Sequence, residues 1–335
     1  MGRAPRDMRR RELTVRHGAR SFAAWRYTPR SVSGAMLLVP GLHFLGPADP
    51  RLDRFCRVLA HAGMDVLCPF LPDHTQLLVG ENAGADSIAA YDRLAAESGV
   101  KHPGVFSISF GSRPALEVAA CRDVGGLMLF GGCADWTEAV RFSLTGAPGR
   151  RHDPLNRPIV FLHLLPHFSG FTDAARTRIA AALRRQMRLT WGRMELKEND
   201  RARPFAERVV AELTNARERE LFMHATGFLP GGDERALEAL ETCRDAFAFL
   251  APERWAAKVK TGLRTVAHGR SDDVIPVEHA PRLAAMLNAP CLVSGAYEHA
   301  GRGGAADFLT DAKISLETLR RMARTGCTNL PSGSY

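Results

Sequence analysis

The chain has 335 residues, 45% of them hydrophobic, and a formal net charge of +9, so it is long enough to bury one large core and an inserted or second small domain. No run approaches 18 apolar residues, and we therefore expect no membrane-spanning helix. The seven cysteines are odd in number and lack paired or metal-type spacing, which predicts small buried thiols in a reducing compartment rather than disulfides.

The first thirty residues carry most of the net charge. They hold nine arginines against Asp7 and Glu12, and no apolar segment follows the basic start, so we expect no secretory signal and a cytoplasmic location. A flexible basic arm has the charge to touch nucleic acid or anionic lipid. Because no aromatic or base-reading motif accompanies it, we interpret it as a solubilising tail and expect no nucleic-acid partner.

Strand and helix patterns alternate up to residue 130. Apolar alternation around His17-Gly18 predicts an antiparallel pair, and later segments alternate between short apolar runs and helical spacing. This alternation predicts right-handed crossovers and a mainly parallel sheet flanked by helices, an α/β fold. The strands are expected at residues 12–16, 21–27, 35–39, 65–69, 104–106 and 125–130, and the helices at 50–60, 85–96 and 113–121.

Ser109 lies where an apolar strand pattern changes abruptly into a helix pattern. A turn of this kind strains the backbone of its central residue, and small residues two positions away on each side let strand and helix approach closely. Those neighbours are Ser107 and Gly111. The pattern is that of a nucleophile elbow; its alternative is an ordinary turn rich in serine and glycine.

Two later apolar runs end in loops that carry an acid and a histidine. The run from Val266 leads into a loop with Asp272, and the run 291–294 leads into a loop that ends at His299. The order is Ser, Asp, His, each just past a strand-like run, where an open α/β sheet places its ligand-binding loops. A serine hydroxyl needs a base such as His299 to remove its proton, and Asp272 would orient that imidazole.

With these residues the chain resembles the α/β-hydrolase superfamily, whose acid loop commonly reads Gly-x-x-Asp-x-x-Val-Pro. Residues 269–276 read Gly-Arg-Ser-Asp-Asp-Val-Ile-Pro, with Ile in place of Val. The resemblance implies a mainly parallel central sheet flanked by helices, with a helical cap inserted after the sixth strand. It places the core domain at residues 1–133 and 259–335 and the cap at 134–258.

The resemblance also assigns an oxyanion loop to the residues after strand 35–39. The family usually has His before the Gly of this loop, and here Pro40 stands in its place, before Gly41. The donors are expected to be backbone N–H groups, which a side-chain change need not remove, and by position they are those of Leu42 and Phe110. For His43 two interpretations remain open: contact with the loop or substrate, or a surface histidine without a mechanistic role.

Residues 134–258 show helical stretches, at 173–189, 204–219 and 233–250, without a convincing strand. Trp136 and Phe168 are candidates to line a substrate pocket, although packing between helices is the alternative for each. His163 and His167 have the four-residue spacing of metal ligands on a helix. Because Pro166 interrupts that helix and no third ligand is near, we expect no metal here.

Alternatives remain for the acid and the base. Asp273 follows Asp272 directly, and Asp135 comes just after the sixth strand, where an acid is also topologically possible. His299 has the alternative of a loop histidine that caps the Gly-rich segment 301–304.

The sequence therefore predicts a serine hydrolase that cleaves a small-molecule carboxylic ester through an acyl-enzyme, without a cofactor. A thioesterase or acyltransferase would use the same three residues. A non-catalytic binding protein with this fold is the third hypothesis, and Pro40 is the feature that favours it. The oligomeric state is left open.

Overall fold

The structure is a computed structural model that describes residues 8–150, 152–198, 200–296 and 311–326. The chain divides into two compact units. The first comprises residues 1–134, 251–272 and 277–335, and the second comprises 135–250 and 273–276. No helix in the described part of the chain is both long and apolar enough to cross a membrane.

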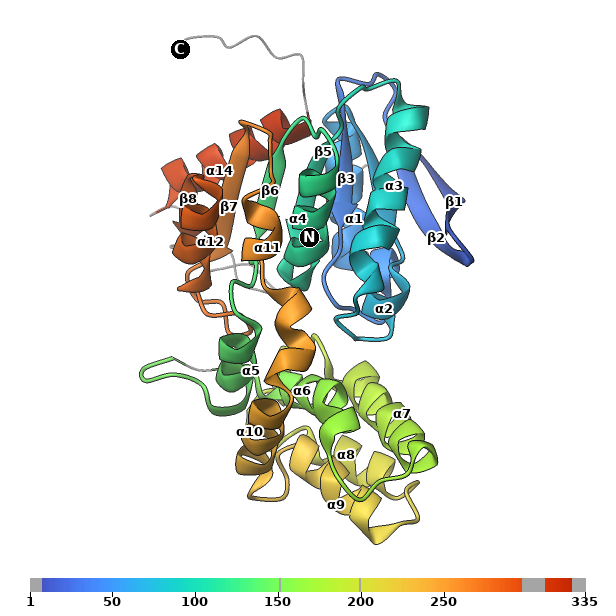
Figure 1. The fold of residues 1–335 in the computed structure, drawn as a ribbon, viewed down its shortest axis with the longest axis vertical. Coiled ribbons are helices and arrows are strands. Elements are labelled where there is room, and N and C mark those ends of the chain that lie inside the picture. Colours follow the sequence, from blue (N-terminus) through green and yellow to red (C-terminus); the bar gives the residue numbers. More distant parts are fainter. Residues whose placement is uncertain (1–7, 151, 199, 297–310, 327–335) are drawn as a thin grey trace. The chain divides into compact units, whose positions relative to one another are not determined.

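The first unit is built on an eight-stranded sheet with strand order β1-β2-β4-β3-β5-β6-β7-β8 (Figure 1). The strands from β4 to β8 pair in parallel, and β1 and β2 add an antiparallel hairpin at one edge. This confirms the expected α/β fold. The strands are β1 (Arg9–His17), β2 (Arg20–Thr28), β3 (Gly34–Val39), β4 (Met64–Pro69), β5 (Gly104–Ile108), β6 (Leu127–Phe130), β7 (Arg264–Gly269) and β8 (Cys291–Ser294).

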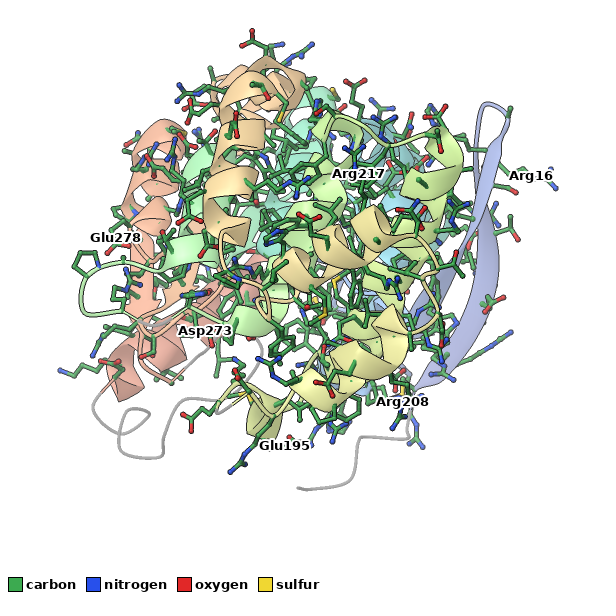
Figure 2. The ribbon with its side chains drawn as sticks, turned by 90° about the horizontal axis from the view of Figure 1, so that it is seen from below. Arg16, Glu195, Arg208, Arg217, Asp273 and Glu278 are labelled. Carbon is green, nitrogen blue, oxygen red and sulfur yellow. The ribbon has the colours of Figure 1, made fainter. Side chains whose placement is uncertain are left out.

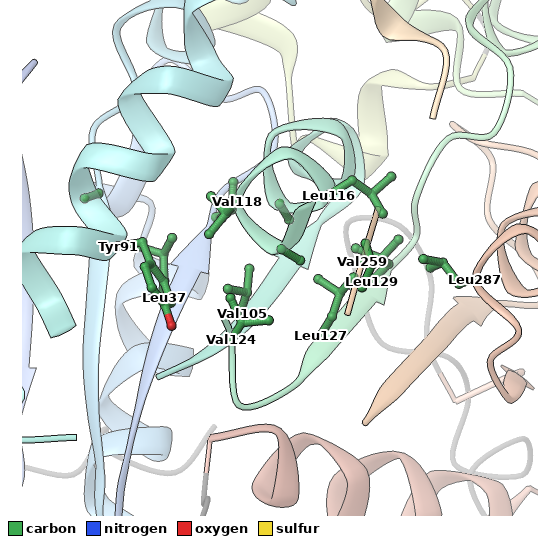
Figure 3. Close-up of a cluster of buried hydrophobic side chains, with 14 of the residues drawn as sticks. Leu37, Tyr91, Val105, Leu116, Val118, Val124, Leu127, Leu129, Val259 and Leu287 are labelled. Atoms are coloured by element: carbon green, nitrogen blue, oxygen red, sulfur yellow. The ribbon is translucent and has the colours of Figure 1, made fainter. Parts of the chain in front are cut away.

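Both faces of the central strands β3 and β4 are buried under helices, and successive side chains of a strand point into opposite clusters. In β3, Leu37 and Val39 pack on one face and Met36 and Leu38 on the other. Figure 3 shows part of the first cluster, between the sheet and its helices. The helices on that face are α3 (Asn82–Ser98), α4 (Ser112–Cys121) and α12 (His279–Leu287), whereas α1 (Pro50–His61) and α14 (Ala312–Gly326) supply the opposite cluster.

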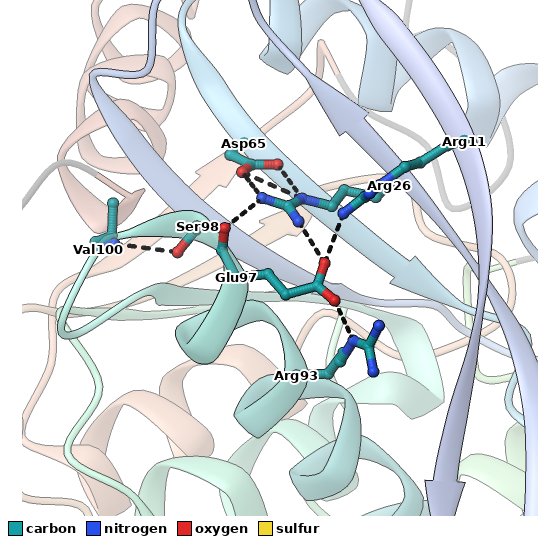
Figure 4. A network of polar contacts seen from close by, with 7 residues as sticks. All are labelled: Arg11, Arg26, Asp65, Arg93, Glu97, Ser98 and Val100. Carbon is teal, nitrogen blue, oxygen red and sulfur yellow. Dashed lines mark hydrogen bonds and ion pairs between the residues drawn. The ribbon is translucent and has the colours of Figure 1, made fainter.

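The arginines of the hairpin are largely paired, which corrects the interpretation of this segment as a basic tail. Arg26 is 6% exposed; its guanidinium donates to both carboxylate oxygens of Asp65 and to Glu97, which also accepts from Arg11 (Figure 4). Arg16, near the end of β1, is exposed (Figure 2). Residues 9–28 of the basic segment therefore form a strand pair, and several of its arginines neutralise acids of α1, α3 and β4.

The second unit is helical, and its described residues contain no strand beyond one isolated bridge. The stretch expected as one helix at 204–219 is two helices, because Asn215 accepts hydrogen bonds from the N–H groups of Arg217 and Glu218 and so begins a new helix. The stretch 233–250 is likewise divided near Cys243. The helices are α5 (Trp136–Thr145), α6 (Arg157–Leu164), α7 (Asp173–Thr190), α8 (Arg203–Val210), α9 (Ala216–Ala225) and α10 (Gly232–Thr242), followed by a 3₁₀ segment at Arg244–Leu250.

The cysteines only partly fit the expectation of buried thiols. Cys56, Cys68 and Cys243 are buried, but Cys121 at the end of α4 and Cys291 at the start of β8 are exposed. All six cysteines within the described part of the chain are free thiols.

Candidate active site

The order of the strands brings two predicted site segments together. From β3 the chain crosses to β4 on one side, and it later returns to β5 on the other side of β3. The loops that leave β3 and β5 therefore diverge to opposite faces, and a crevice forms at the carboxyl ends of such strands. Pro40 to Leu42 follow β3 at this edge, and Ser109 follows β5.

Ser109 has the backbone conformation of a strained turn. Its φ is +57°, a left-handed value that costs a residue with a side chain about 1–2 kcal/mol. The residue begins a short 3₁₀ turn (Ser109–Gly111) between β5 and α4, and its carbonyl accepts the N–H of Ser112. The side chain is buried, with 6% exposure. The predicted strand-to-helix turn is thus present, with Ser109 at its strained position.

Two glycines let the loop after β3 approach this turn. A Cβ on Gly41 would lie 3.0 Å from the Ser109 Cβ, so the backbone of the expected oxyanion loop lies directly against the serine. A Cβ on Gly111 would lie 2.6 Å from the Val39 carbonyl oxygen and 2.7 Å from that of Pro40. Any side chain at residue 111 would therefore push the two segments apart, which explains the small residue two positions after the serine.

The rest of the expected oxyanion loop is held by internal contacts. Leu42 is half-buried directly after Gly41, and Phe110 is half-buried directly after Ser109. The His43 Nε2 lies 3.1 Å from the Asp49 carboxylate, and its Nδ1 accepts the N–H of Leu45. Burial lowers the pKa of His43, although Asp49 opposes this shift. Both ring nitrogens of His43 thus have partners inside the loop, which favours a role in loop structure over substrate contact.

His74 is a contact of this loop that the sequence patterns did not single out. It lies in the one-turn helix α2 (Pro72–Thr75), is almost fully buried, and places its Nδ1 2.9 Å from the Pro40 carbonyl oxygen. The available signal was weak: a polar Pro-Asp-His segment shortly after the carboxyl end of a strand, at the edge where the site loops gather.

Asp272 lies in the loop after β7, and its carboxylate faces a histidine of that strand, His268. The side chain is 3% exposed, and its Oδ2 lies 3.3 Å from Nε2 of His268, which is fully buried in β7. His268 belongs to the predicted strand that begins at Val266, and the sequence patterns assigned it no role. A polar residue in an otherwise apolar strand, four positions before the acid, was the signal that pointed to it.

The two alternative acids have other partners. Asp273 belongs to the second unit, where its carboxylate lies 2.6 Å from the Lys197 ammonium and its carbonyl accepts the N–H of Asp153 (Figure 2 labels Asp273). Asp135 accepts the N–H of Glu138 and so caps the start of α5. Each of these carboxylates therefore serves a structural contact.

The remaining predicted residues lie elsewhere. His299 falls outside the described residues. Trp136 and Phe168 lie in the second unit: Trp136 is half-buried with its ring 4.9 Å from that of His163, and Phe168 is 5% exposed and stacks on Phe161. His163 ends its helix with Nδ1 2.7 Å from the Ile159 carbonyl oxygen, and His167 lies in the following 3₁₀ turn. No group of three metal-ligating side chains is found within the described parts of the chain.

Comparisons with known proteins identify the fold. No protein-family model and no curated protein sequence matches the chain. Among solved structures, the acylaminoacyl peptidase of Pyrococcus horikoshii is similar, with a TM-score of 0.53 and 12% identity over 98% of this chain and 43% of that protein. A Pyrococcus furiosus esterase is similar with a TM-score of 0.51 and 10% identity, over 94% of this chain and 90% of the esterase.

The chain has the α/β-hydrolase fold, as the resemblance implied. It spans less than half the length of the acylaminoacyl peptidase. At these identities the similarity defines the fold alone, so a function must be argued from the residues of the site.

Proposed function

We propose that the protein is a serine hydrolase that cleaves a carboxylic ester through an acyl-enzyme, with Ser109 as nucleophile. The observation that carries the proposal is the left-handed backbone of a buried serine between β5 and α4, against the glycine loop after β3. A non-glycine residue in this conformation needs support from its surroundings, and strain of this kind is typical of functional turns.

The proposed reaction follows from the chemistry of the three residues. His299 removes the Ser109 proton as the hydroxyl oxygen attacks the ester carbonyl, and the imidazolium returns the proton to the leaving alcohol. Asp272 holds the imidazole in the tautomer this requires. The N–H groups of Leu42 and Phe110 would stabilise the oxyanion by roughly 3 kcal/mol each. Water then repeats the sequence on the acyl-enzyme.

The contacts of the acids favour Asp272 for the third role. Its carboxylate is buried beside a histidine of its own unit, whereas Asp273 pairs with Lys197 and Asp135 caps a helix.

We further propose that residues 134–258 act as a cap that selects the substrate. Thioesters and peptide amides belong in the same test, because the same three residues can attack either, and one of the similar structures is a peptidase.

The test is covalent labelling of the full chain with a fluorophosphonate, followed by assay on p-nitrophenyl esters, acyl-thioesters and acyl-amino acid amides. Ser109→Ala should abolish labelling and lower kcat by on the order of 10⁴-fold while the protein stays folded, because members of a triad act as a unit. Ser107→Ala and Ser112→Ala are the matched controls and should retain labelling. Loss of labelling in a control but not in Ser109→Ala would place the nucleophile elsewhere. A wild-type chain that neither labels nor hydrolyses any substrate would support the non-catalytic hypothesis.

A further inference from the structure

The loop after β3 contacts a buried imidazole that belongs to a different element, the short helix α2. His74, in α2, is 2% exposed, and its Nδ1 lies 2.9 Å from the Pro40 carbonyl oxygen. Pro40 belongs to the segment that lies against Ser109, although His74 is more than thirty residues away from it in the chain.

The direction of this hydrogen bond is determined by its acceptor. Burial lowers the pKa of His74 to about 4, and the nearby charges of Arg113 and Asp86 act in opposite directions. The ring is therefore neutral at neutral pH and carries a single N–H. A carbonyl oxygen can only accept, so Nδ1 is the protonated nitrogen and donates to Pro40.

The Pro40 carbonyl is confined on two sides. On one side is the His74 ring, and on the other is Gly111 of the elbow, whose Cβ position would be 2.7 Å from the same oxygen. Proline has no N–H, so this carbonyl is the only polar backbone group by which residue 40 can be held. The carbonyl and the Gly41 N–H share one peptide plane, and the Leu42 N–H lies in the next plane, joined to it through the two backbone dihedrals of Gly41. Gly41 lies against Ser109, since its Cβ position would be 3.0 Å from the Ser109 Cβ, so the planes on both sides of it are restrained.

We propose that His74 is a positioning residue of the oxyanion loop: its Nδ1–H holds the Pro40 carbonyl and thereby aims the Leu42 N–H at the oxyanion formed on Ser109. The inference rests on the proposed function and deepens it by naming a residue outside the predicted triad. His74 touches no reacting atom, so it acts on the rate through the loop. Its loss is expected to weaken transition-state stabilisation more than substrate binding.

The kinetic test uses a matched pair of variants of the full chain, assayed with p-nitrophenyl acetate. His74→Leu has no hydrogen-bond donor. His74→Asn has a side chain of nearly the same shape as leucine and places an amide N–H close to the position of Nδ1. We expect His74→Leu to lower kcat by roughly 10-fold to 100-fold with little change in KM. This is less than the roughly 10²-fold to 10³-fold cost of losing an oxyanion donor, because the Leu42 N–H would be misdirected and not removed. His74→Asn should recover most of that loss. If His74→Leu does not fold, His74→Phe replaces it as the variant without a donor.

A second buried histidine of the same unit controls for general destabilisation. His279 is 1% exposed, and its Nδ1 accepts the N–H of Ala134, away from the Pro40 loop. His279→Leu should lower the melting temperature as much as His74→Leu while kcat stays near the wild-type value. Equal losses of kcat in the two leucine variants, or no recovery in His74→Asn, would overturn the proposal.

Hydrogen exchange separates this inference from the proposed function. Peptides that cover residues 41–46 should exchange faster in His74→Leu than in wild type, His74→Asn or His279→Leu, whether or not the protein hydrolyses an ester. Unchanged exchange in His74→Leu would show that His74 does not hold the loop. Faster exchange in His74→Leu, together with a wild-type chain that fails to label with fluorophosphonate, would leave the contact in place and reject the hydrolase instead.

Discussion

The carboxylates of Asp272, Asp273 and Asp135 are distinguished by what each one contacts. Asp272 is buried beside His268, Asp273 pairs with Lys197, and Asp135 caps α5. Only one carboxylate can accept the N–H of the proposed base. Because their partners differ, we expect substitution of each aspartate to affect kcat differently, even though two of the three are adjacent in the chain.

We expect Asp272→Asn to lower kcat by roughly 10³-fold to 10⁴-fold, because an amide favours the wrong tautomer of the base. Asp135→Asn should have little effect, since asparagine is an equally good helix cap. Asp273→Asn should be mild, because it weakens an ion pair with Lys197 without touching the proposed base. The measurement is kcat for the three variants on one ester. A large loss at Asp135 with mild losses at the other two would move the acid to the loop after β6.

The buried imidazole of His74 should also make the free energy of unfolding depend on pH. Its pKa is about 4 in the folded protein, against 6.5 for an ordinary histidine. Between these values the unfolded chain binds a proton that the folded chain does not, so stability falls as the pH drops from 6.5 toward 4. The lowered pKa predicts a loss of up to about 3 kcal/mol over this range from His74 alone. His74→Asn should remove that part and flatten the curve in urea unfolding between pH 4.5 and 7. Parallel curves for the two proteins would contradict a buried neutral imidazole.

Among the elements, the β1–β2 hairpin is held by buried ion pairs in addition to its backbone pairing with β4. β1 is mostly exposed, whereas Arg26 of β2 is 6% exposed and is bound by Asp65 of β4 and Glu97 of α3. The Asp65 hydrogen bonds raise the pKa of Arg26 against the effect of burial. The pairs therefore attach the edge hairpin to the parallel part of the sheet.

Arg26→Met should lower the free energy of unfolding by about 3–5 kcal/mol, because it leaves the buried Asp65 carboxylate without its cation. Arg16→Met removes an exposed arginine from the same hairpin and should change stability by less than about 0.5 kcal/mol. Urea denaturation of both variants gives the comparison. Similar small losses would mean that water or another side chain compensates Asp65.

For the whole molecule, the proposal is that one unit carries the chemistry and the other selects the substrate. The predicted nucleophile, acid and oxyanion donors all belong to the first unit, and the second unit contains the aromatic candidates. In that unit Trp136 is half-buried beside His163 and Phe247, whereas Phe142 is 4% exposed and packs in its interior.

Trp136→Ala should change the relative kcat/KM among esters of different chain length by about 1–3 kcal/mol, while a small fluorophosphonate still labels Ser109. Phe142→Leu is the control, since a packed interior residue should alter stability and leave the chain-length profile unchanged. Kinetic profiles of both variants on esters of increasing acyl length provide the measurement. An unchanged profile for Trp136→Ala and for comparable variants would assign specificity to the loops of the first unit.

The sequence by itself determined the elements of the sheet and the turn at Ser109. Apolar runs, helical spacing and small residues around a serine are properties of neighbours in the chain, so the strands from β1 to β6 and the helices α1, α3 and α4 appeared where the patterns predicted. The one-turn helix α2 was not predicted. Helix ends were less predictable from periodicity: the break before Asn215 depends on a side chain that competes with the helix backbone.

Only the tertiary structure decided which distant residues meet. That Arg11 and Arg26 are paired follows from the places of β4 and α3 beside the hairpin, which no local pattern contains. The contact of His74 with Pro40 depends on the order in which strands β3, β4 and β5 lie in the sheet. The partners of the three aspartates could not be predicted from the sequence either, because a carboxylate's role depends on the groups that face it. Residues adjacent in sequence, such as Asp272 and Asp273, can face different surroundings.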